Sequence, residues 1–362
     1  MTIRLFLAHT PLHILYSLSL IRAEPGPSPW LAVFNDFEGA RRAVDGLAGL
    51  LPASGRTILL PGAQDAPRPP HPLRRLTAHL PLIAAVRRAR HLLAPHPPQT
   101  VYLFNDMRPD VQQIAVDALR RSPGCRLYAV EDGAAAYVDR QPPERTHARR
   151  LTALFPLVYG RGFERLEGMG GFSLLQAAYL TFPEHANAAL RRLPRHALPR
   201  PVFTPPELDA LIGLFAPPED GLFDWQGLSR PALICVPHSS ALTPALLANL
   251  RGLIRAWEGQ GWQVLLKAHP REQEDLARLL AVGEDVRVLV RTIPAELIIA
   301  RLGSALRAVA SGPSSVLHTT RWLNPAAEAW LISAEDAPFP PELARFLAAI
   351  GVRMPASEDS HR

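Results

Sequence analysis

The chain has 362 residues, of which 48% are hydrophobic and 20% are charged, so it is long enough for two globular domains with sizeable cores. Its formal net charge of +6 favours anionic partners such as nucleotides, phosphoglycans or membrane surfaces, although arginines spread over a solvated surface give the same excess. The basic residues form no block with interleaved aromatic residues, so nucleic-acid binding has no specific support.

The first 26 residues are rich in apolar side chains, but they do not fit a signal peptide. His9 and Pro11 interrupt the apolar run, and no small-residue cleavage site follows it. No stretch of the chain reaches the roughly 18 apolar residues that a membrane span needs. The two cysteines, Cys125 and Cys235, lie in or beside apolar runs, which is typical of buried, reduced thiols. We therefore expect a cytoplasmic protein without a zinc site.

Apolar runs and helical patterns alternate through the first half of the chain. The apolar run at 3–8 is followed by Thr10 and Pro11, which are typical of the cap and the first position of a helix. Further strands are predicted at 30–34, 57–60, 100–104 and 125–130, and further helices from about residue 38, at 72–93 and at 109–121. Strands and helices that alternate with short connections indicate a parallel sheet.

The segment 72–93 has an apolar face and a face rich in arginine. This pattern is typical of a helix that packs on a sheet and turns its arginines to solvent. It also fits a helix that makes a peripheral contact with an anionic membrane. Both interpretations stay open at the level of the sequence.

Proline is dense between residues 191 and 221, which predicts a connection between two domains with one short helix inside it. The alternation then resumes, with predicted strands at 232–236, 262–267, 286–290, 305–310 and 328–333 and helices at 244–261, 271–281, 294–302, 314–323 and beyond Pro341. The predicted divisions are a first domain, a linker, a second domain and a C-terminal helix with its tail, at 1–200, 201–225, 226–340 and 341–362. The predicted fold class is α/β, with two doubly wound Rossmann-like domains that face a central cleft.

Three short motifs follow predicted strands, at the carboxyl ends where such sheets bind ligands. They are Glu131-Asp132-Gly133 in the first half, and His269-Pro270 and Ser314-Ser315 in the second half. Each motif alone also fits an ordinary turn, loop or helix cap. Their shared position at strand ends is what favours a functional site.

The motifs of the second half suit a bound phosphate. The turn that begins at Gly312 leads into a helix at Ser314 and Ser315, where free N–H groups, hydroxyls and the helix dipole attract an anion. His269 can donate to a phosphate oxygen and help a phosphate depart. Pro237–Ser240 follows the first strand of this half, and position alone suggests that it reaches the same ligand.

Two charged residues extend this hypothesis. Lys267 is the only lysine among 39 basic residues, and it shares a face with His269 only if the strand stays extended through Ala268. Glu296 begins a helix, where its carboxylate can accept two hydrogen bonds from a vicinal diol such as ribose. The same glutamate also fits an ordinary first helical turn.

The first half supplies the complementary chemistry. Asp132 can accept a proton from an attacking hydroxyl, and Glu131 can hold Asp132 or the acceptor. His9 and His13 lie at the mouth of the first strand, where their position suits the lining of the site. An anion cradle, a group that helps phosphate leave and a base on the other domain together indicate inverting transfer of a sugar from a nucleotide.

The ordered set Glu131-Asp132-Gly133, Lys267-Ala268-His269-Pro270 and Ser314-Ser315 resembles the bacterial sialyltransferases and polysialyltransferases. That family combines a D/E-D/E-G, an HP and an S-S or S-T motif with the two-domain GT-B fold. The stretches LAHTPLHILYSLSLI at the N-terminus and YLFND at 102–106 are also similar, and the resemblance spans about residues 1–335. The family uses CMP-sialic acid without an essential metal, so the resemblance implies no cofactor and no metal.

The resemblance also implies a role for individual residues. Asp132 is then the base on the acceptor hydroxyl, and His269 assists the departure of CMP. Ser314 and Ser315 hold the CMP phosphate, Glu296 binds the ribose, and Lys267 is the basic residue that often precedes the HP motif. The first domain is then the acceptor side and the second binds the nucleotide sugar.

The predicted activity is transfer of sialic acid, or a related nonulosonic acid, from a CMP donor to a glycan hydroxyl in surface polysaccharide or lipopolysaccharide synthesis. CMP-Kdo is an alternative donor, because it has the same leaving group and a similar anionic sugar. A non-catalytic nucleotide- or glycan-binding protein on a decayed GT-B fold is the alternative of another class. The predicted location is the cytoplasm, with peripheral contact at the inner face of the cell membrane as an option.

Overall fold

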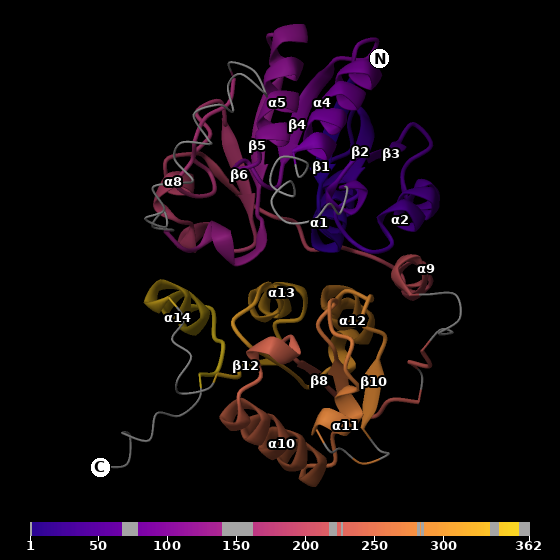
Figure 1. The fold of residues 1–362 in the computed structure, drawn as a ribbon, viewed down its shortest axis with the longest axis vertical. Coiled ribbons are helices and arrows are strands. Elements are labelled where there is room, and N and C mark those ends of the chain that lie inside the picture. Colours follow the sequence, from indigo (N-terminus) through magenta and orange to yellow (C-terminus); the bar gives the residue numbers. More distant parts are fainter. Residues whose placement is uncertain are drawn as a thin grey trace. The chain divides into compact units, whose positions relative to one another are not determined.

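The computed structural model describes residues 2–66, 79–139, 162–216, 223–225, 227–280, 283, 286–333 and 340–354. The chain divides into two compact units, Met1–Val202 and Phe203–Arg362. Each unit consists of a parallel sheet with helices, as Figure 1 shows. The predicted α/β class with two Rossmann-like domains is therefore confirmed.

The sheet of unit 1 has seven strands in the order β3-β2-β1-β4-β5-β6-β7. Their bounds are β1 (Ile3–Ala8), β2 (Ser28–Phe34), β3 (Arg56–Leu60), β4 (Pro98–Leu103), β5 (Arg126–Val130), β6 (Ala177–Leu180) and β7 (Arg195–Ala197). All pairings are parallel, and the strand order reverses between β1 and β4. Such a reversal is where doubly wound sheets bind their ligands.

Five α-helices are described in unit 1: α1 (Pro11–Ala23), α2 (Ala40–Leu47), α4 (Leu80–Leu93), α5 (Pro109–Arg121) and α8 (Ala188–Arg191). Helix α1 begins as predicted, because the Thr10 side chain accepts the backbone N–H of His13 and Pro11 takes the first helical position. Every residue of β1 and β2 is buried, which explains why these strands are mostly apolar, with Arg4 and Ser28 as the polar exceptions.

Helix α4 forms the last part of the predicted amphipathic segment, and residues 72–78 lie outside the described part of the chain. Its apolar residues Ala85, Val86, Ala89 and Leu93 are buried. Arg87 and Arg88 are exposed on the other side of the helix. The apolar face of α4 thus packs in the core of unit 1, as in the first of the two interpretations.

The sheet of unit 2 has five parallel strands in the order β10-β9-β8-β11-β12. Their bounds are β8 (Pro231–Cys235), β9 (Gln263–Lys267), β10 (Arg287–Leu289), β11 (Ala308–Ser311) and β12 (Glu328–Leu331). Here the strand order reverses between β8 and β11. All five strands were predicted, each within three residues at either end.

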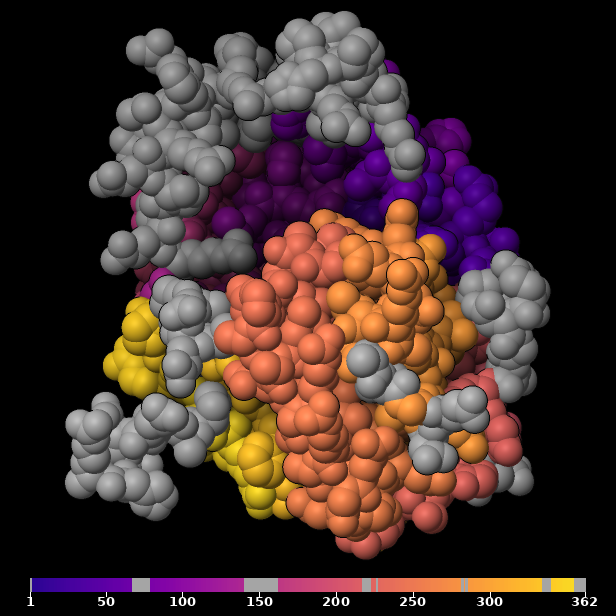
Figure 2. Space-filling view, turned by 60° about the horizontal axis from the view of Figure 1, so that its bottom comes forward, coloured from indigo at the N-terminus to yellow at the C-terminus, as the bar shows by residue number. Residues whose placement is uncertain are grey.

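The described helices of unit 2 are α9 (Pro205–Phe215), α10 (Pro244–Gly259), α11 (Leu276–Leu280), α12 (Ala295–Leu302), α13 (Ser315–Leu323) and α14 (Pro341–Ala349). Helix α9 lies inside the predicted linker and packs on α12, where Arg301 donates to Asp209 at 2.6 Å. Helix α10 buries Leu250 and Trp257 in the core of unit 2. The outer face of α10 and α11 belongs to the surface that Figure 2 shows in orange tones.

Helix α11 begins at Leu276, five residues later than the pattern predicted. The reason is Glu272, whose buried carboxylate accepts the backbone N–H groups of Ser239, Gln273 and Glu274. Burial alone would raise the pKa of Glu272, but these three donors lower it to about 2. The residues before α11 therefore form a loop that is fixed to the end of β8.

Both cysteines are free thiols; Cys125 is buried, as predicted, whereas Cys235 is half-buried. Burial raises the pKa of Cys125 to about 11 and that of Cys235 to about 12, so neither is a reactive thiolate near neutral pH.

None of the helices in the described ranges combines the length and the apolar character that crossing a membrane requires.

Candidate active site

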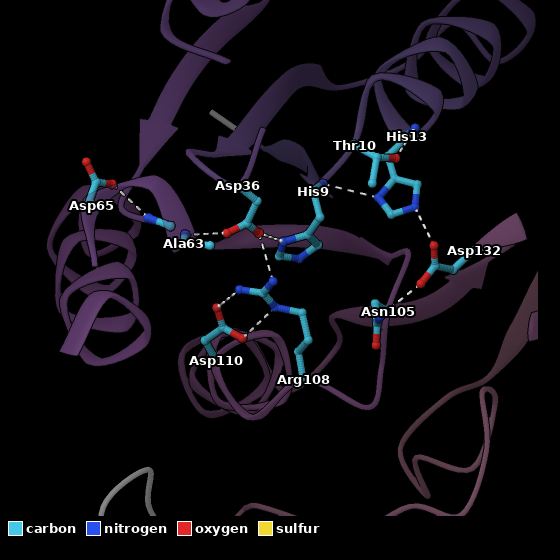
Figure 3. A network of polar contacts seen from close by, with 11 residues as sticks. His9, Thr10, His13, Asp36, Ala63, Asp65, Asn105, Arg108, Asp110 and Asp132 are labelled. Carbon is cyan, nitrogen blue, oxygen red and sulfur yellow. Dashed lines mark hydrogen bonds and ion pairs between the residues drawn. The ribbon is translucent and has the colours of Figure 1, made fainter. Parts of the chain in front are cut away.

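The carboxyl ends of β2, β1, β4 and β5, which are neighbours in the sheet, bring a cluster of charged and polar side chains together in unit 1 (Figure 3). The members are His9 and His13 from β1 and α1, Asp36 after β2, Asn105, Arg108 and Asp110 after β4, and Asp132 after β5. The cluster spans the point where the strand order reverses. It therefore occupies the expected ligand-binding edge of the sheet.

Asp132 is held by one hydrogen bond on each carboxylate oxygen. His13 Nε2 lies 2.9 Å from Oδ1, and Asn105 Nδ2 donates to Oδ2 at 2.8 Å. The side chain of Asp132 is 27% exposed, whereas that of His13 is 2% exposed. Asp132 is thus the solvent-facing member of the pair, and His13 lies behind it.

The tautomer of His13 follows from its two contacts. Its Nδ1 accepts the backbone N–H of His9 at 3.1 Å, so the ring proton must be on Nε2, which then donates to Asp132. The imidazole ring also stacks on Phe104, with the ring centroids 4.5 Å apart. Both ring nitrogens and one ring face of His13 are therefore engaged inside the protein.

Burial by itself would raise the pKa of Asp132, because a buried carboxylate is poorly solvated. His13 and the hydrogen bond from Asn105 stabilise the ionised form and hold the pKa of Asp132 below its usual value. Asp132 is consequently a carboxylate near neutral pH. Each of its oxygens has a second lone pair with which it can accept a proton from a ligand.

Glu131 precedes Asp132 and points into the core of unit 1, where it is fully buried. It accepts hydrogen bonds from the hydroxyls of Tyr16, Tyr137 and Thr181 and from the backbone N–H of Thr181. Gly133 follows with a φ of 57°, a left-handed conformation that favours glycine. The motif therefore combines the buried Glu131, the partly exposed carboxylate of Asp132 and a turn at Gly133. The position of Glu131 suits support of Asp132.

His9 belongs to a second, more buried part of the cluster. Its Nδ1 lies 2.8 Å from Asp36, which also accepts a hydrogen bond from Arg108 at 2.7 Å. Arg108 in turn makes a bidentate contact with the fully buried Asp110. Burial and the nearby Arg108 lower the pKa of His9 to about 4, so His9 is neutral and donates from Nδ1. Its Nε2 is buried without a hydrogen-bond partner among the described residues.

In unit 2, the predicted residues lie at the carboxyl ends of β8, β9 and β11. Ser314 occupies the cap position of α13 with extended backbone, and Ser315 is the first residue of this helix. The hydroxyl of Ser314 makes no capping hydrogen bond and lies 2.9 Å from the hydroxyl of Ser311. Gly312 is buried in the turn between β11 and α13, and both serines are half-buried. The N-terminus of α13 therefore has no side-chain cap from Ser314, and its backbone N–H groups can bind an anion.

His269 is half-buried and follows β9, and Pro270 beside it is exposed. The Nδ1 of His269 accepts the backbone N–H of Arg271 at 3.2 Å, which leaves the ring proton on Nε2. Burial, followed by the nearby His238 and Arg271, lowers the pKa of His269. The ring of His238 lies 5.7 Å away from that of His269, at right angles. His269 is thus a neutral donor at neutral pH when no ligand is bound.

Lys267 is buried, and its position changes the argument made for it from the sequence. Strand β9 ends at this residue, so Lys267 and His269 do not share a face of an extended strand. Its Nζ donates to the carbonyl oxygens of Ala268 and Arg291, both at 2.6 Å. At most one N–H of this ammonium is left for a ligand, and its observed contacts join the ends of β9 and β10.

Glu296 lies in the first turn of α12 and is 8% exposed. Burial raises the pKa of Glu296, and neither Lys267 nor His318 fully offsets this effect. Among the described residues, the only hydrogen-bond donor to the carboxyl group of Glu296 is the backbone N–H of the same residue. A buried carboxyl group with so few partners suits a ligand that supplies hydroxyl donors.

No family model matches this chain, and no curated protein sequence does either. Solved structures with similar folds include the glycotransferase of kitacinnamycin (11% identity, covering 97% of this chain and 85% of that chain, TM-score 0.53). A UDP-GlcNAc 2-epimerase from Methanocaldococcus jannaschii is also similar (12% identity, covering 98% of this chain and 88% of that chain, TM-score 0.54). So is a UDP-glucosyltransferase from Polygonum tinctorium (13% identity, covering 99% of this chain and 86% of that chain, TM-score 0.52). These similarities show that the fold is of the GT-B type.

Sequence reasoning found Asp132 but not the residues that hold it. Asn105 follows a predicted strand within YLFND, and that position is the one signal that points to it. His13 was noted only for its place near the first strand, and Asp36, Arg108 and Asp110 were not identified. Within the described ranges, no three His, Cys, Asp or Glu side chains converge as metal ligands would.

Proposed function

We propose that this protein is an inverting glycosyltransferase that moves sialic acid, or a related nonulosonic acid, from a CMP donor to a glycan hydroxyl. One observation carries the proposal: an ionised, partly exposed Asp132 at the ligand-binding edge of unit 1, with both oxygens held by His13 and Asn105. A carboxylate fixed in this way suits removal of a proton from an acceptor hydroxyl.

The proposed reaction is a single displacement at the anomeric carbon of the donor. The acceptor oxygen forms a bond to this carbon while Asp132 takes the hydroxyl proton. The bond between the anomeric carbon and the phosphate oxygen breaks, and CMP leaves with that electron pair. His269 supports the departure by donating its Nε2–H to a phosphate oxygen, which stabilises the developing charge.

The nucleotide is assigned to unit 2. The N-terminus of α13, with Ser314 and Ser315, supplies N–H groups and hydroxyls for the phosphate, and Gly312 forms the turn that leads there. Glu296 is proposed to accept the ribose hydroxyls, because its buried carboxyl group has few partners of its own. Lys267 is then a support of the strand ends rather than a major contact to the phosphate.

The identity of the donor rests on the motif set rather than on the fold. The three similar structures are a glycotransferase and two proteins named for UDP-linked sugars, and similarity at 11–13% identity does not extend to substrates. CMP-Kdo is retained as the alternative donor. A non-catalytic nucleotide- or glycan-binding protein is the alternative of another class, in which Asp132 and His269 carry out no chemistry.

A donor screen tests the proposal. The protein is incubated with CMP-sialic acid, CMP-Kdo, UDP-GlcNAc and UDP-glucose, and release of CMP or UDP is measured with and without EDTA. We expect release of CMP that EDTA does not abolish. Release of UDP alone would reassign the donor, and nucleotide release from none of the donors would leave the binding protein as the better interpretation. Mass spectrometry of an acceptor glycan panel then identifies the product.

A contact with an anionic membrane is also proposed, in line with synthesis of a surface polysaccharide or lipopolysaccharide. Because the apolar face of α4 is buried, this contact would be electrostatic, through exposed residues such as Arg87 and Arg88. Binding to anionic vesicles at low salt that disappears at high salt is expected. Equal binding to neutral vesicles would contradict it.

A further inference from the structure

We infer that His13 is the positioning residue of the site, because it holds the carboxylate of Asp132 in place through its Nε2–H while the backbone N–H of His9 fixes its tautomer. The inference rests on the proposed role of Asp132 as the base. It deepens that role by stating which residue of the His13–Asp132 pair meets the substrate.

The order within the pair follows from burial and from hydrogen-bond capacity. A histidine that acts as the base must present an unprotonated nitrogen to the substrate, but Nδ1 of His13 already accepts from His9 and Nε2 already carries a proton. The side chain of His13 is 2% exposed, whereas that of Asp132 is 27% exposed. The carboxylate therefore faces the ligand, and the imidazole supports it from the interior.

The placement of His13 is determined by the start of α1. Thr10 caps this helix by accepting the backbone N–H of His13, which puts the imidazole in the first turn, directly beside the end of β1. The His9 N–H then reaches Nδ1, and Phe104 at the end of β4 stacks on the ring. The contacts of His13 with His9 and Thr10, which Figure 3 shows, and its stacking on Phe104 thus fix the direction in which Nε2–H points.

Asn105 completes the arrangement from the other side of the carboxylate. It donates to Oδ2 while His13 donates to Oδ1, so rotation of the carboxylate would break at least one of the two bonds. The titratable groups that act on Asp132 are His13 and His9 from the β1–α1 segment and Asp106 after β4. Burial raises the pKa of Asp106, whereas the backbone N–H groups of Gly170 and Phe172 donate to its carboxylate and stabilise the ionised form.

Two substitutions of His13 separate its two contacts. In His13→Asn, the shorter amide overlaps Nδ1 and can still accept the His9 N–H, but it does not reach Asp132. In His13→Gln, the longer amide places a donor near the position of Nε2. Both variants remove the ring and its stacking on Phe104, so they are matched for the loss of packing.

The decisive measurement is the pKa of Asp132 itself, obtained by NMR titration of aspartate-labelled protein with Asp132→Asn to assign the resonance. Loss of a hydrogen bond to a charged group predicts that His13→Asn raises this pKa by about 1 unit, whereas His13→Gln stays closer to the wild type. The acid limb of kcat/KM should move to higher pH in His13→Asn by the same amount. An unchanged pKa of Asp132 in His13→Asn would overturn the inference.

Failure of the inference and failure of the proposed function are distinguishable. If the pKa of Asp132 shifts as expected but the wild type turns over no donor, the pairing stands and the transferase proposal fails. If donors are turned over and the pKa does not respond, only the inference fails. Should His13→Asn not fold, the nitrogen-15 spectrum of wild-type His13 decides: protonated Nε2 with unprotonated Nδ1 supports the inference, and the opposite tautomer contradicts it.

Discussion

The carboxyl edges of the two sheets hold polar residues in different ways. In unit 1, ionisable side chains contact one another: His9 with Asp36, Arg108 with Asp36 and Asp110, and His13 with Asp132. In unit 2, the polar side chains mostly contact backbone. Glu272 accepts three N–H groups, Lys267 donates to two carbonyls, and His269 accepts one N–H.

The difference indicates different tasks for two sheets of the same kind. A network of side chains fixes the protonation state and the orientation of one carboxylate, which suits proton transfer at Asp132. Side chains that order loops leave helix ends and N–H groups facing solvent, which suits binding of an anionic ligand at α13. The proposed reaction therefore assigns the proton chemistry to unit 1 and the recognition of the nucleotide to unit 2.

Asp132→Asn should have the largest effect, because it removes the base and leaves the shape of the side chain. If Asp132 accepts the acceptor proton, turnover should fall by roughly 10²- to 10⁴-fold, measured as release of nucleotide in the presence of acceptor. Asp45→Asn is a matched control, since it makes the same change of charge at an exposed position of α2. Near wild-type turnover in Asp132→Asn would remove this residue from the mechanism.

Arg108→Met tests whether the side-chain network of unit 1 depends on its central cation. The substitution leaves the buried carboxylates of Asp110 and Asp36 without that partner, so the free energy of unfolding should fall by about 3 kcal/mol. Arg90→Met is the control, because Arg90 is 46% exposed and its ion pair with Asp117 should contribute less than about 1 kcal/mol. Equal losses in urea unfolding would show that Arg108 has no special role.

The lowered pKa of His9 predicts how the stability of unit 1 depends on pH. The pKa of His9 is about 4 in the folded protein and near its ordinary value of 6.5 in the unfolded chain, so between these values only the unfolded chain binds the proton. Stability is therefore lost as the pH falls, by about 2 kcal/mol between pH 7.5 and 5.

His9→Asn isolates this contribution. Its amide can still donate to Asp36, but it does not titrate in this range. We expect the variant to show a flatter dependence of unfolding free energy on pH than the wild type, measured by urea unfolding at both values. Parallel curves for the two proteins would mean that His9 does not titrate with a lowered pKa.

Much of the fold could be predicted from the sequence, because the strands that form both ligand-binding edges are buried apolar runs. The exceptions are β6 and β7, which have four and three residues. Two of the four residues of β6 are alanines, which have low strand propensity, and all three residues of β7 are exposed. Strand β6 is thus short and weak in strand propensity although it is apolar, and β7 lacks the hydrophobic signal on which sequence reasoning depends.

The site was predicted only in part, because its contacts join distant segments. Asp132 was identified from its place after a strand, but its partner His13 lies 119 residues earlier and Arg108 lies 72 residues after Asp36. These contacts depend on strand order and on helix caps, which no short motif contains. Lys267 shows the opposite case, since a distinctive residue in the sequence is occupied by backbone carbonyls in the fold.

The smallest expected effect concerns the anion site proposed in unit 2. Ser314 caps α13 by position but makes no capping hydrogen bond, whereas Thr243 at the start of α10 accepts the N–H of Leu246 at 3.2 Å. Thr243→Ala should therefore reduce the free energy of unfolding by about 1 kcal/mol and leave the KM for the donor unchanged.

Ser314→Ala should do the reverse. Stability should change by less than about 0.5 kcal/mol, and the KM for the donor should rise by roughly tenfold or somewhat more, as loss of one hydrogen bond to a charged ligand predicts. Because both residues have the same cap position, the comparison separates a hydroxyl that stabilises a helix from one that binds a ligand. A loss of stability without a change in KM would assign Ser314 to the helix and contradict its place in the donor site.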